Sequence, residues 1–120
     1  MKRDMDLVRK ILLDIAAHDD PNKHIEVTAE GYSEGQVHYH LHILVEGGFV
    51  EALDAAGAAQ SFYYMPTGLT WKGHEFLDDI SDETVWKKTK ETVSSKVGSV
   101  SLAVVQEVAK ATVKTLLGLP

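Results

Sequence analysis

The stretch from Gly31 to Ala52, GYSEGQVHYHLHILVEGGFVEA, constrains the fold of this chain more than any other segment. Ser33 is a residue type favoured as a helix N-cap, and Gln36 three positions later completes a capping box. Apolar residues then recur at helical spacing until a pair of glycines ends the pattern. The segment therefore predicts a helix over 34–46 followed at once by a strand over 49–53. The stripe expected to face a core consists of Val37, Leu41, Leu44 and Val45.

The segments before this stretch predict one helix, two turns and a short strand. Residues 4–18 carry apolar side chains at helical spacing, and Asp4 is placed to cap that helix. Proline, asparagine and two acids over 19–22 favour a turn. HIEVT at 24–28 is short, alternating and β-branched, which predicts an edge strand, and 29–32 is long enough only for a tight turn. The buried stripe expected on the first helix is Met5, Val8, Ile11, Leu12 and Ile15.

The segments after it predict a hairpin and a third helix. The small residues of 54–60 are typical of a hairpin tip, and SFYYM at 61–65 predicts the returning strand. Proline and glycine over 66–68 are expected to break that strand. Thr70 is predicted to cap a helix over 71–80. The apolar contacts expected from this helix are Trp71, Phe76, Leu77 and Ile80.

Two more helices are predicted toward the C-terminus. One begins at Ser81–Asp82 and runs to about Lys96, with Val97–Ser99 as a hinge or cap. The other spans 101–117, and Gly118 is its stop. The apolar stripes expected on these two helices contain Val85, Trp86, Thr89 and Val93, and then Leu102, Val105, Val108, Ala109, Val113 and Leu116.

Composition bounds the class of protein. The 120 residues and the apolar fraction of 44% predict one domain with an appended piece. The sequence has no cysteine, which excludes disulfides and thiolate metal sites and suits a reducing cytosol. No apolar run is long enough for a signal peptide or a membrane span, so we expect a cytoplasmic protein. The formal charge of −6 opposes generic binding to a polyanion.

Two segments carry a resemblance to a known family. The stretch 31–52 resembles the recognition helix and first wing strand of winged-helix proteins. LTWKGHEFLDDI at 69–80 resembles the leucine-threonine-x-x-glycine-x-x-phenylalanine-leucine element that follows the wing in many such regulators. Together with the opening MKRDMDLVRKILLDI and Thr84–Trp86, nearly the whole chain is similar to a winged-helix family of unknown function from small bacterial and prophage proteins.

The resemblance implies an α+β fold with a winged-helix domain over 1–80. It implies a helical extension over 81–120 that packs on this domain or forms a dimer. The wing would have two strands, with the short edge strand at 24–28 beside them. The helix that normally braces a recognition helix against DNA is reduced here to the turn at 29–32. The resemblance therefore supplies a fold and no activity.

Charge placement argues against DNA reading by this domain. From His24 to Trp71 the sequence has no Lys or Arg and six acids. Affinity for duplex DNA comes largely from Lys and Arg on phosphates, and contacts to bases need such contacts around them. The alternative, a DNA-binding transcriptional regulator of the winged-helix type, must find its cations elsewhere. Its predicted contacts are Lys2, Arg3, Lys87, Lys88 and Lys90.

The leading hypothesis is a protein-interaction or regulatory module of bacterial or prophage origin. On the helix at 34–46, Tyr39 and Ile43 are four residues apart and both are predicted to face outward. An exposed aromatic–aliphatic pair without basic neighbours suits a protein partner. The open alternative is that the first or last helix of the same chain covers this face. The predicted partner-binding residues are Gln36, Tyr39, His42, Ile43 and Glu46.

The motif His38-Tyr-His40-Leu-His42 raises the question of a metal site. On a strand the three imidazoles would share one face, but on a helix residues 38 and 42 are neighbours while 40 points roughly the opposite way. Because the cap and the glycines favour a helix, we predict no metal. We expect His40 to pack and hydrogen-bond at the edge of the core, and His38 and His42 to be exposed to solvent.

No catalytic set emerges from the sequence, and the chain is expected to be no enzyme and to need no cofactor. Its adjacent acidic pairs diverge on a helix, and it has neither a nucleophile elbow nor a glycine-rich phosphate loop. The apolar stripe at 101–117 predicts a homodimer through the C-terminal helix, by analogy with other winged-helix proteins.

Overall fold

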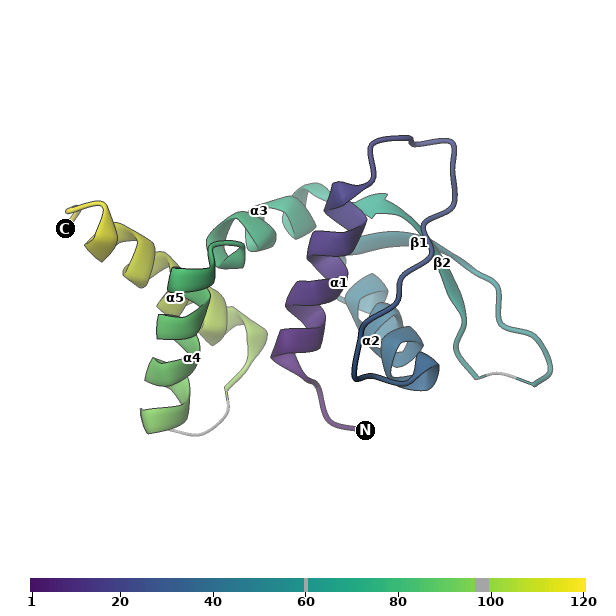
Figure 1. The fold of residues 1–120 in the computed structure, drawn as a ribbon, viewed down its shortest axis with the longest axis horizontal. Helices are drawn as coiled ribbons and strands as arrows, with labels where there is room; N and C mark the ends of the chain where they lie inside the picture. The colour runs from purple at the N-terminus through teal and green to yellow at the C-terminus, as the bar shows by residue number, and fades with distance from the viewer. Residues whose placement is uncertain (60, 97–99) are drawn as a thin grey trace. The chain divides into compact units, whose positions relative to one another are not determined.

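The computed structural model describes residues 1–59, 61–96 and 100–120 (Figure 1). In these residues the chain is α+β, with five helices and one two-stranded antiparallel sheet. No helix among them is both long and apolar enough to cross a membrane. The predicted hinge at Val97–Ser99 lies outside the described residues. The elements are α1 (Met5–Ala17), α2 (Glu34–Glu46), β1 (Val50–Asp54), β2 (Tyr64–Leu69), α3 (Trp71–Ile80), α4 (Glu83–Lys96) and α5 (Leu102–Leu116).

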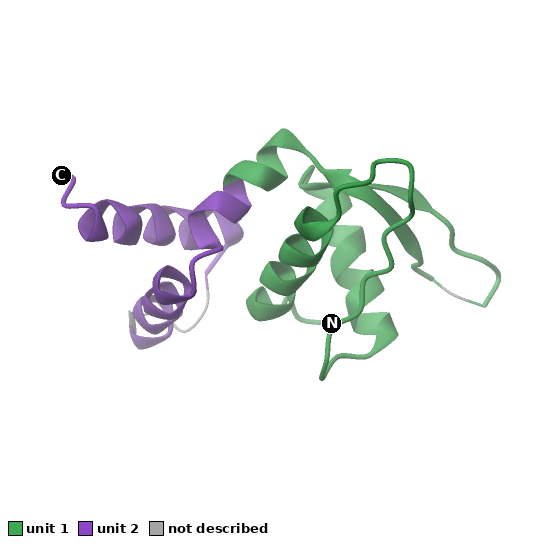
Figure 2. Ribbon diagram, turned by 45° about the horizontal axis from the view of Figure 1, so that its top comes forward, with its two compact units in different colours: residues 1–75 green, residues 76–120 purple. Residues whose placement is uncertain are grey.

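The chain divides into two compact units, Met1–Glu75 and Phe76–Pro120 (Figure 2). The division falls inside α3. Counting charged residues over each unit gives six cations and twelve acids in the first, and six of each in the second. The whole formal charge of −6 therefore belongs to the first unit.

The first unit is built on α1, α2 and the hairpin of β1 and β2. α1 packs against α2 and β2, and α2 packs against both strands. The two helices begin as the sequence predicts: Asp4 accepts the Leu7 N–H, and Ser33 and Gln36 form a complete capping box. On α1 the buried stripe includes Leu7, whereas Met5 is only half-buried. The prediction missed Leu7 because this residue lies at the side of the assumed stripe.

The hairpin runs further than predicted. β2 continues through Pro66 to Leu69, so the expected break at 66–68 is wrong. The pairing is irregular between Glu51 and Ala52, where Pro66 enters opposite Ala52. Because proline has no N–H to donate, a strand accommodates it where the ladder shifts register. Thr67, the residue in the shift, donates its hydroxyl to the Glu51 carbonyl at 3.2 Å.

The predicted edge strand at 24–28 does not form as a strand. This segment is extended and buries Ile25 and Val27, and Ile25 N–H donates a backbone hydrogen bond to the Pro66 carbonyl of the sheet at 3.3 Å. The proline cannot return a hydrogen bond, and so the ladder cannot extend in regular alternation. The segment therefore lies beside β2 and closes the core without joining the sheet.

The junction between β2 and α3 brings two backbones into close contact. Thr70 caps α3 by accepting the Gly73 N–H at 3.0 Å, as predicted, and its own N–H donates to the Phe49 carbonyl. A side chain at Gly73 would overlap the Phe49 carbonyl oxygen, which explains the glycine in the motif. Trp71 is 81% exposed, so the prediction that it supplies a core contact is wrong. Trp71 is the first residue of α3, and its side chain lies outside the buried stripe of that helix.

In the second unit α4 and α5 pack against each other. Asp82 caps α4 by accepting the Val85 N–H at 2.9 Å, and Thr89 is buried with its hydroxyl bonded to the Val85 carbonyl. On α5 the buried part of the predicted stripe is Val105 and Ala109, whereas Leu116 is 49% exposed.

A polar latch joins the start of α1 to α2. The Tyr32 hydroxyl donates to Asp4 Oδ2 at 2.9 Å, and the Asp4 N–H donates to His40 Nε2 at 2.8 Å. His40 Nδ1 in turn donates to the Gln36 carbonyl at 2.7 Å. His40 is 1% exposed, so the prediction that it packs and hydrogen-bonds is confirmed. The latch leaves no polar atom of this buried imidazole unsatisfied.

The latch predicts a loss of stability at high pH. Burial, followed by the hydrogen bond to Asp4 and the charges of Asp4 and Asp6, raises the pKa of Tyr32 from 10.0 to about 12. Between these values the unfolded chain gives up the phenolic proton while the folded chain keeps it. We therefore expect the free energy of unfolding to fall as the pH rises from about 10 to about 12. The fall should be smaller in Tyr32→Phe, measured by urea titration; equal slopes in the two proteins would contradict the assignment.

Candidate functional site

The returning arm of the hairpin lies on the outward side of α2. Phe62 stacks on His42 with ring centroids 4.2 Å apart, and it meets Tyr39 edge to face at 5.8 Å. One residue along, Tyr63 stacks on His38 at 4.2 Å. This set, which we call the α2–hairpin surface, comprises Glu34, His38, Tyr39, His42, Phe62, Tyr63 and Tyr64.

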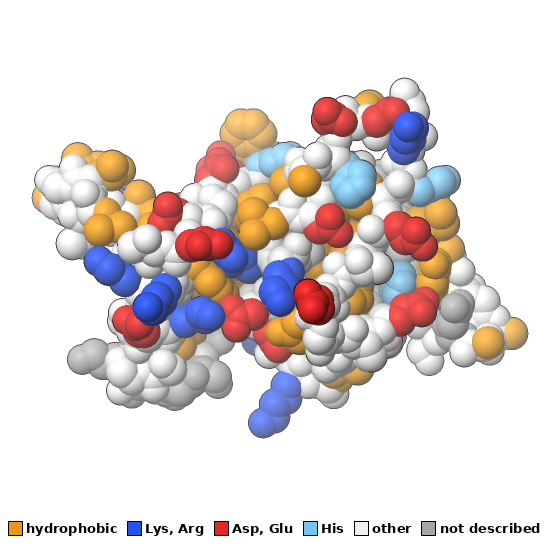
Figure 3. Space-filling model, in the orientation of Figure 1, with side chains coloured by type: hydrophobic (Ala, Val, Ile, Leu, Met, Phe, Trp, Pro, Cys, Tyr) orange, Lys and Arg blue, Asp and Glu red, His pale blue; other side chains and the backbone are white. Residues whose placement is uncertain are grey.

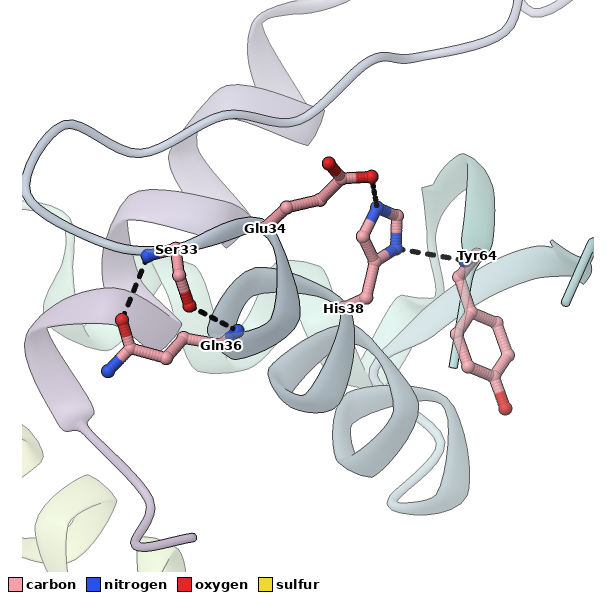
Figure 4. Close-up of polar contacts among 5 residues, drawn as sticks. All are labelled: Ser33, Glu34, Gln36, His38 and Tyr64. Carbon is pink, nitrogen blue, oxygen red and sulfur yellow. Dashed lines mark hydrogen bonds and ion pairs between the residues drawn. The ribbon is translucent and has the colours of Figure 1, made fainter. Parts of the chain in front are cut away.

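His38 is the most deeply placed member of this surface. Its Nδ1 accepts the Tyr64 N–H at 3.0 Å, and its Nε2 lies 4.0 Å from Glu34 Oε1 (Figure 4). Burial lowers the pKa of His38 from 6.5, and the charge of Glu34 opposes this shift only in part. The imidazole is therefore neutral near pH 7, with its proton on Nε2 because Nδ1 is an acceptor. It leaves the Glu34 carboxylate without a compensating positive charge.

The lowered pKa of His38 predicts a loss of stability in mild acid. The unfolded chain binds a proton near pH 6.5, but the folded chain resists it, so the free energy of unfolding should decrease as the pH falls below about 6.5. In His38→Asn, which can keep an acceptor for the Tyr64 N–H, this decrease should be smaller. A proton NMR titration of the imidazole gives the direct reading. A midpoint at or above 6.5 for His38 would refute the expectation.

Both ring nitrogens of His42 have a polar partner. Its Nδ1 is hydrogen-bonded to the Tyr64 hydroxyl at 2.8 Å, and its Nε2 lies 3.7 Å from Glu46 Oε2. Burial raises the pKa of Tyr64, with smaller contributions from the charges of Asp54 and Glu46. At ordinary pH the Tyr64 phenol is therefore protonated.

The three histidines of the helix thus have three different sets of partners. The prediction that His38 and His42 are exposed to solvent is wrong: His38 is buried at 8% exposure and His42 is half-buried. The reason is the arm at 62–64, which the helix pattern alone could not place over them. Within the described residues, no three His, Asp or Glu side chains come together as metal ligands would.

Two hollows adjoin the Tyr63–His38 stack. The larger has a volume of about 470 Å³ and lies between the extended segment 24–29 and the residues 63–65. The smaller has a volume of about 430 Å³ and is bordered by Met1, Tyr39 and Phe62. Glu34, His38 and Tyr63 line both. The aromatic stack is therefore a wall shared by two adjoining hollows, with a carboxylate at its edge.

Apart from histidines, the charged side chains that line the two hollows are carboxylates. Glu26 and Glu34 border the larger hollow, and the run from His24 to Trp71 contains no Lys or Arg. On the face drawn in Figure 3, carboxylate, histidine and hydrophobic side chains of the first unit lie side by side. The surface thus offers carboxylates and ring faces, which are groups that attract cations and apolar side chains.

The structure places the five predicted partner-binding residues on α2 with different degrees of access. Tyr39, His42 and Ile43 are half-buried, and Glu46 has a largely exposed side chain. Gln36 is half-buried, and its Oε1 accepts the Ser33 N–H at 2.9 Å as part of the cap. Phe62 of the hairpin arm packs against both Tyr39 and His42.

The cations proposed for DNA contact belong to different parts of the chain. Lys2 and Arg3 lie in the exposed N-terminal segment of the first unit. Lys87, Lys88 and Lys90 lie on α4 of the second unit, where Lys90 is 5.8 Å from the centre of the Trp86 ring. None of them lines either hollow.

Sequence reasoning missed Phe62, Tyr63 and Tyr64 as members of the surface. Their high β-propensity predicts a strand for all three residues. In the structure β2 begins at Tyr64, so Phe62 and Tyr63 precede it. The available signal was the run of three aromatics directly after a flexible tip, opposite a helix whose outer side carries aromatic rings.

Comparison with known proteins supplies the family. The family model described as "Hypothetical protein (DUF2513)" matches residues 2–99, well over half of the chain. The chain belongs to this family. The DUF2513 match includes every member of the α2–hairpin surface and ends before α5.

The DUF2513 assignment is accompanied by a relative of nearly the same length. An "Uncharacterized protein" of Haemophilus influenzae (strain ATCC 51907 / DSM 11121 / KW20 / Rd) is 33% identical over 118 residues, which is 98% of this chain and 99% of the relative. No solved structure matches the chain. The family is thus one of unknown function.

Proposed function

We propose that this DUF2513 protein is a protein-interaction module with a winged-helix fold, and that the α2–hairpin surface binds its partner. The order helix, extended segment, turn, helix and hairpin over residues 5–69 supports the winged-helix assignment. The contact of Ile25 with Pro66 puts the extended segment beside β2, where winged-helix proteins carry their third strand. Bacterial or prophage origin and a regulatory role belong to the same proposal.

The proposal rests mainly on one observation: the two hollows beside α2 are lined by aromatic rings and carboxylates. A DNA-reading helix presents its outer side to the major groove with phosphate contacts around it. Here Phe62 lies across His42 on that side of α2, and Glu26 and Glu34 border the larger hollow. Aromatic rings in adjoining hollows are instead typical of protein interfaces, whose anchors fill such pockets.

The alternative of a DNA-binding regulator depends on Lys2, Arg3, Lys87, Lys88 and Lys90. These cations line neither of the two hollows. The absence of catalysis and the dimer through α5 remain further parts of the proposal, supported by the sequence reasoning alone.

The test is a selection of displayed random peptides on the folded chain. Peptides enriched on the wild type are then measured against the double variant Tyr39→Ala/Phe62→Ala and against a control, Leu53→Ala, which removes an exposed apolar side chain of β1 that lines neither hollow. We expect binding to be lost in the double variant and kept in the control. Failure of any peptide to enrich, or equal binding to all three proteins, would contradict the proposed function.

A further inference from the structure

The stacked rings of Tyr63 and His38, which line both hollows, indicate what kind of ligand could bind there. Tyr63 and His38 lie nearly parallel, with an interplanar angle of 20°, and both residues line each of the two hollows. The larger hollow has carboxylates at its border, from Glu26 and Glu34. The smaller is bordered by Tyr39 and Phe62 and is the more apolar of the two.

Glu34 is the charged group best placed to meet a ligand in either hollow. Its side chain is 72% exposed, and its neighbour His38 is neutral near pH 7 because it is buried and accepts the Tyr64 N–H. In the described parts of the chain, no ion pair between Glu34 and a Lys or Arg is present. The Glu34 carboxylate can therefore pair with a cation supplied by a partner.

We propose that the partner bound at the α2–hairpin surface inserts an arginine side chain into the larger hollow, against Glu34 and the Tyr63 ring, and a neighbouring apolar side chain into the smaller one. This inference rests on the proposed function and names the chemistry of the partner. The occupant is thus an extended, basic–apolar protein segment.

Arginine fits this site better than lysine for two physical reasons. Its planar guanidinium stacks on aromatic faces, and its fork of N–H donors matches a carboxylate. Both an aromatic face and a carboxylate border the same hollow here. The adjoining apolar hollow requires a second side chain beside the arginine, which a free small cation would not supply. A phosphate-bearing ligand is disfavoured at the same place by Glu26 and Glu34.

The test uses acetyl-leucyl-argininamide as the probe, with acetyl-leucyl-citrullinamide as its neutral isostere. Amide NMR spectra of the full chain are recorded during titration with each dipeptide. We expect saturable shifts that centre on residues 34, 38 and 63 with the arginine probe. We expect affinity for the citrulline probe to be weaker by about tenfold, as for loss of a charged hydrogen bond.

Two variants make the result specific. Glu34→Gln should weaken the arginine probe by about tenfold and leave the citrulline probe unchanged. Glu51→Gln, which removes an exposed carboxylate of β1 that lines neither hollow, should change neither affinity. The unchanged dispersion of the amide spectra shows that each variant is folded.

Equal affinity for the two probes, no saturable shift, or an unaltered affinity in Glu34→Gln would overturn the arginine assignment. The proposed function fails separately. If selected peptides require Tyr39 and Phe62 but contain no basic residue, the interaction surface survives and the arginine inference does not. If no peptide is selected, the proposed function itself fails.

Discussion

Replacing Gly73 with alanine should lower the free energy of unfolding by about 3 kcal/mol, the upper end of the usual cost of overpacking. A Cβ at this position would overlap the Phe49 carbonyl oxygen and lie 3.3 Å from the Leu69 Cβ. The obstacle cannot rotate away, because the Phe49 carbonyl is backbone and accepts the Thr70 N–H at 3.1 Å. The helix must then separate from the hairpin or distort at its cap. Urea unfolding followed by far-ultraviolet circular dichroism measures the loss.

Gly35 provides the matched control for this substitution. Like Gly73 it lies in the first turn of a helix, but a Cβ there meets only the Ser33 Oγ at 3.9 Å. Because alanine has the higher helix propensity, Gly35→Ala should be neutral or stabilising by up to about 1 kcal/mol. If Gly73→Ala is as stable as the wild type, the close approach of α3 to Phe49 is wrong.

Replacing His40 with alanine should cost about 2 to 4 kcal/mol. The change leaves a cavity beside α1, and it deprives the Asp4 N–H of its acceptor. Both losses fall on the contact between α1 and α2, so the first unit should unfold at lower urea concentration with an unchanged m-value.

His18 is the control for the loss of the imidazole. Its Nδ1 is also hydrogen-bonded to the carbonyl four residues earlier, that of Asp14, at 2.9 Å, but the side chain is exposed. His18→Ala should therefore change the free energy of unfolding by no more than about 0.5 kcal/mol. Similar effects of the two substitutions would show that His40 does not latch α1 to α2.

The helices could be predicted because their signals are local. The cap at Ser33 and Gln36 involves residues three apart, and the observed bounds of α2 agree with the prediction. The stop after Glu46 depends on Gly48, whose φ of +80° favours glycine. Such features need only neighbouring residues, so the pattern contains all the information that sets them.

The candidate site could not be predicted in the same way. The burial of His38 depends on Tyr63 and Tyr64, more than twenty residues away, and on the hairpin arm turning back over α2. The continuation of β2 through Pro66 depends on a shift of register opposite Ala52. Both features result from pairing between distant segments. Local patterns alone predict an exposed His38 and a strand that ends at Pro66.

The placement of carboxylates and aromatic rings on α2 and its hairpin, in place of cations, is the central claim, and DNA affinity tests it most directly. Fluorescence anisotropy of the intact chain with pooled labelled genomic duplexes should show no saturable binding at about 50 mM salt, a condition that exaggerates phosphate contacts. Saturable binding whose affinity falls steeply as salt is raised would contradict the account.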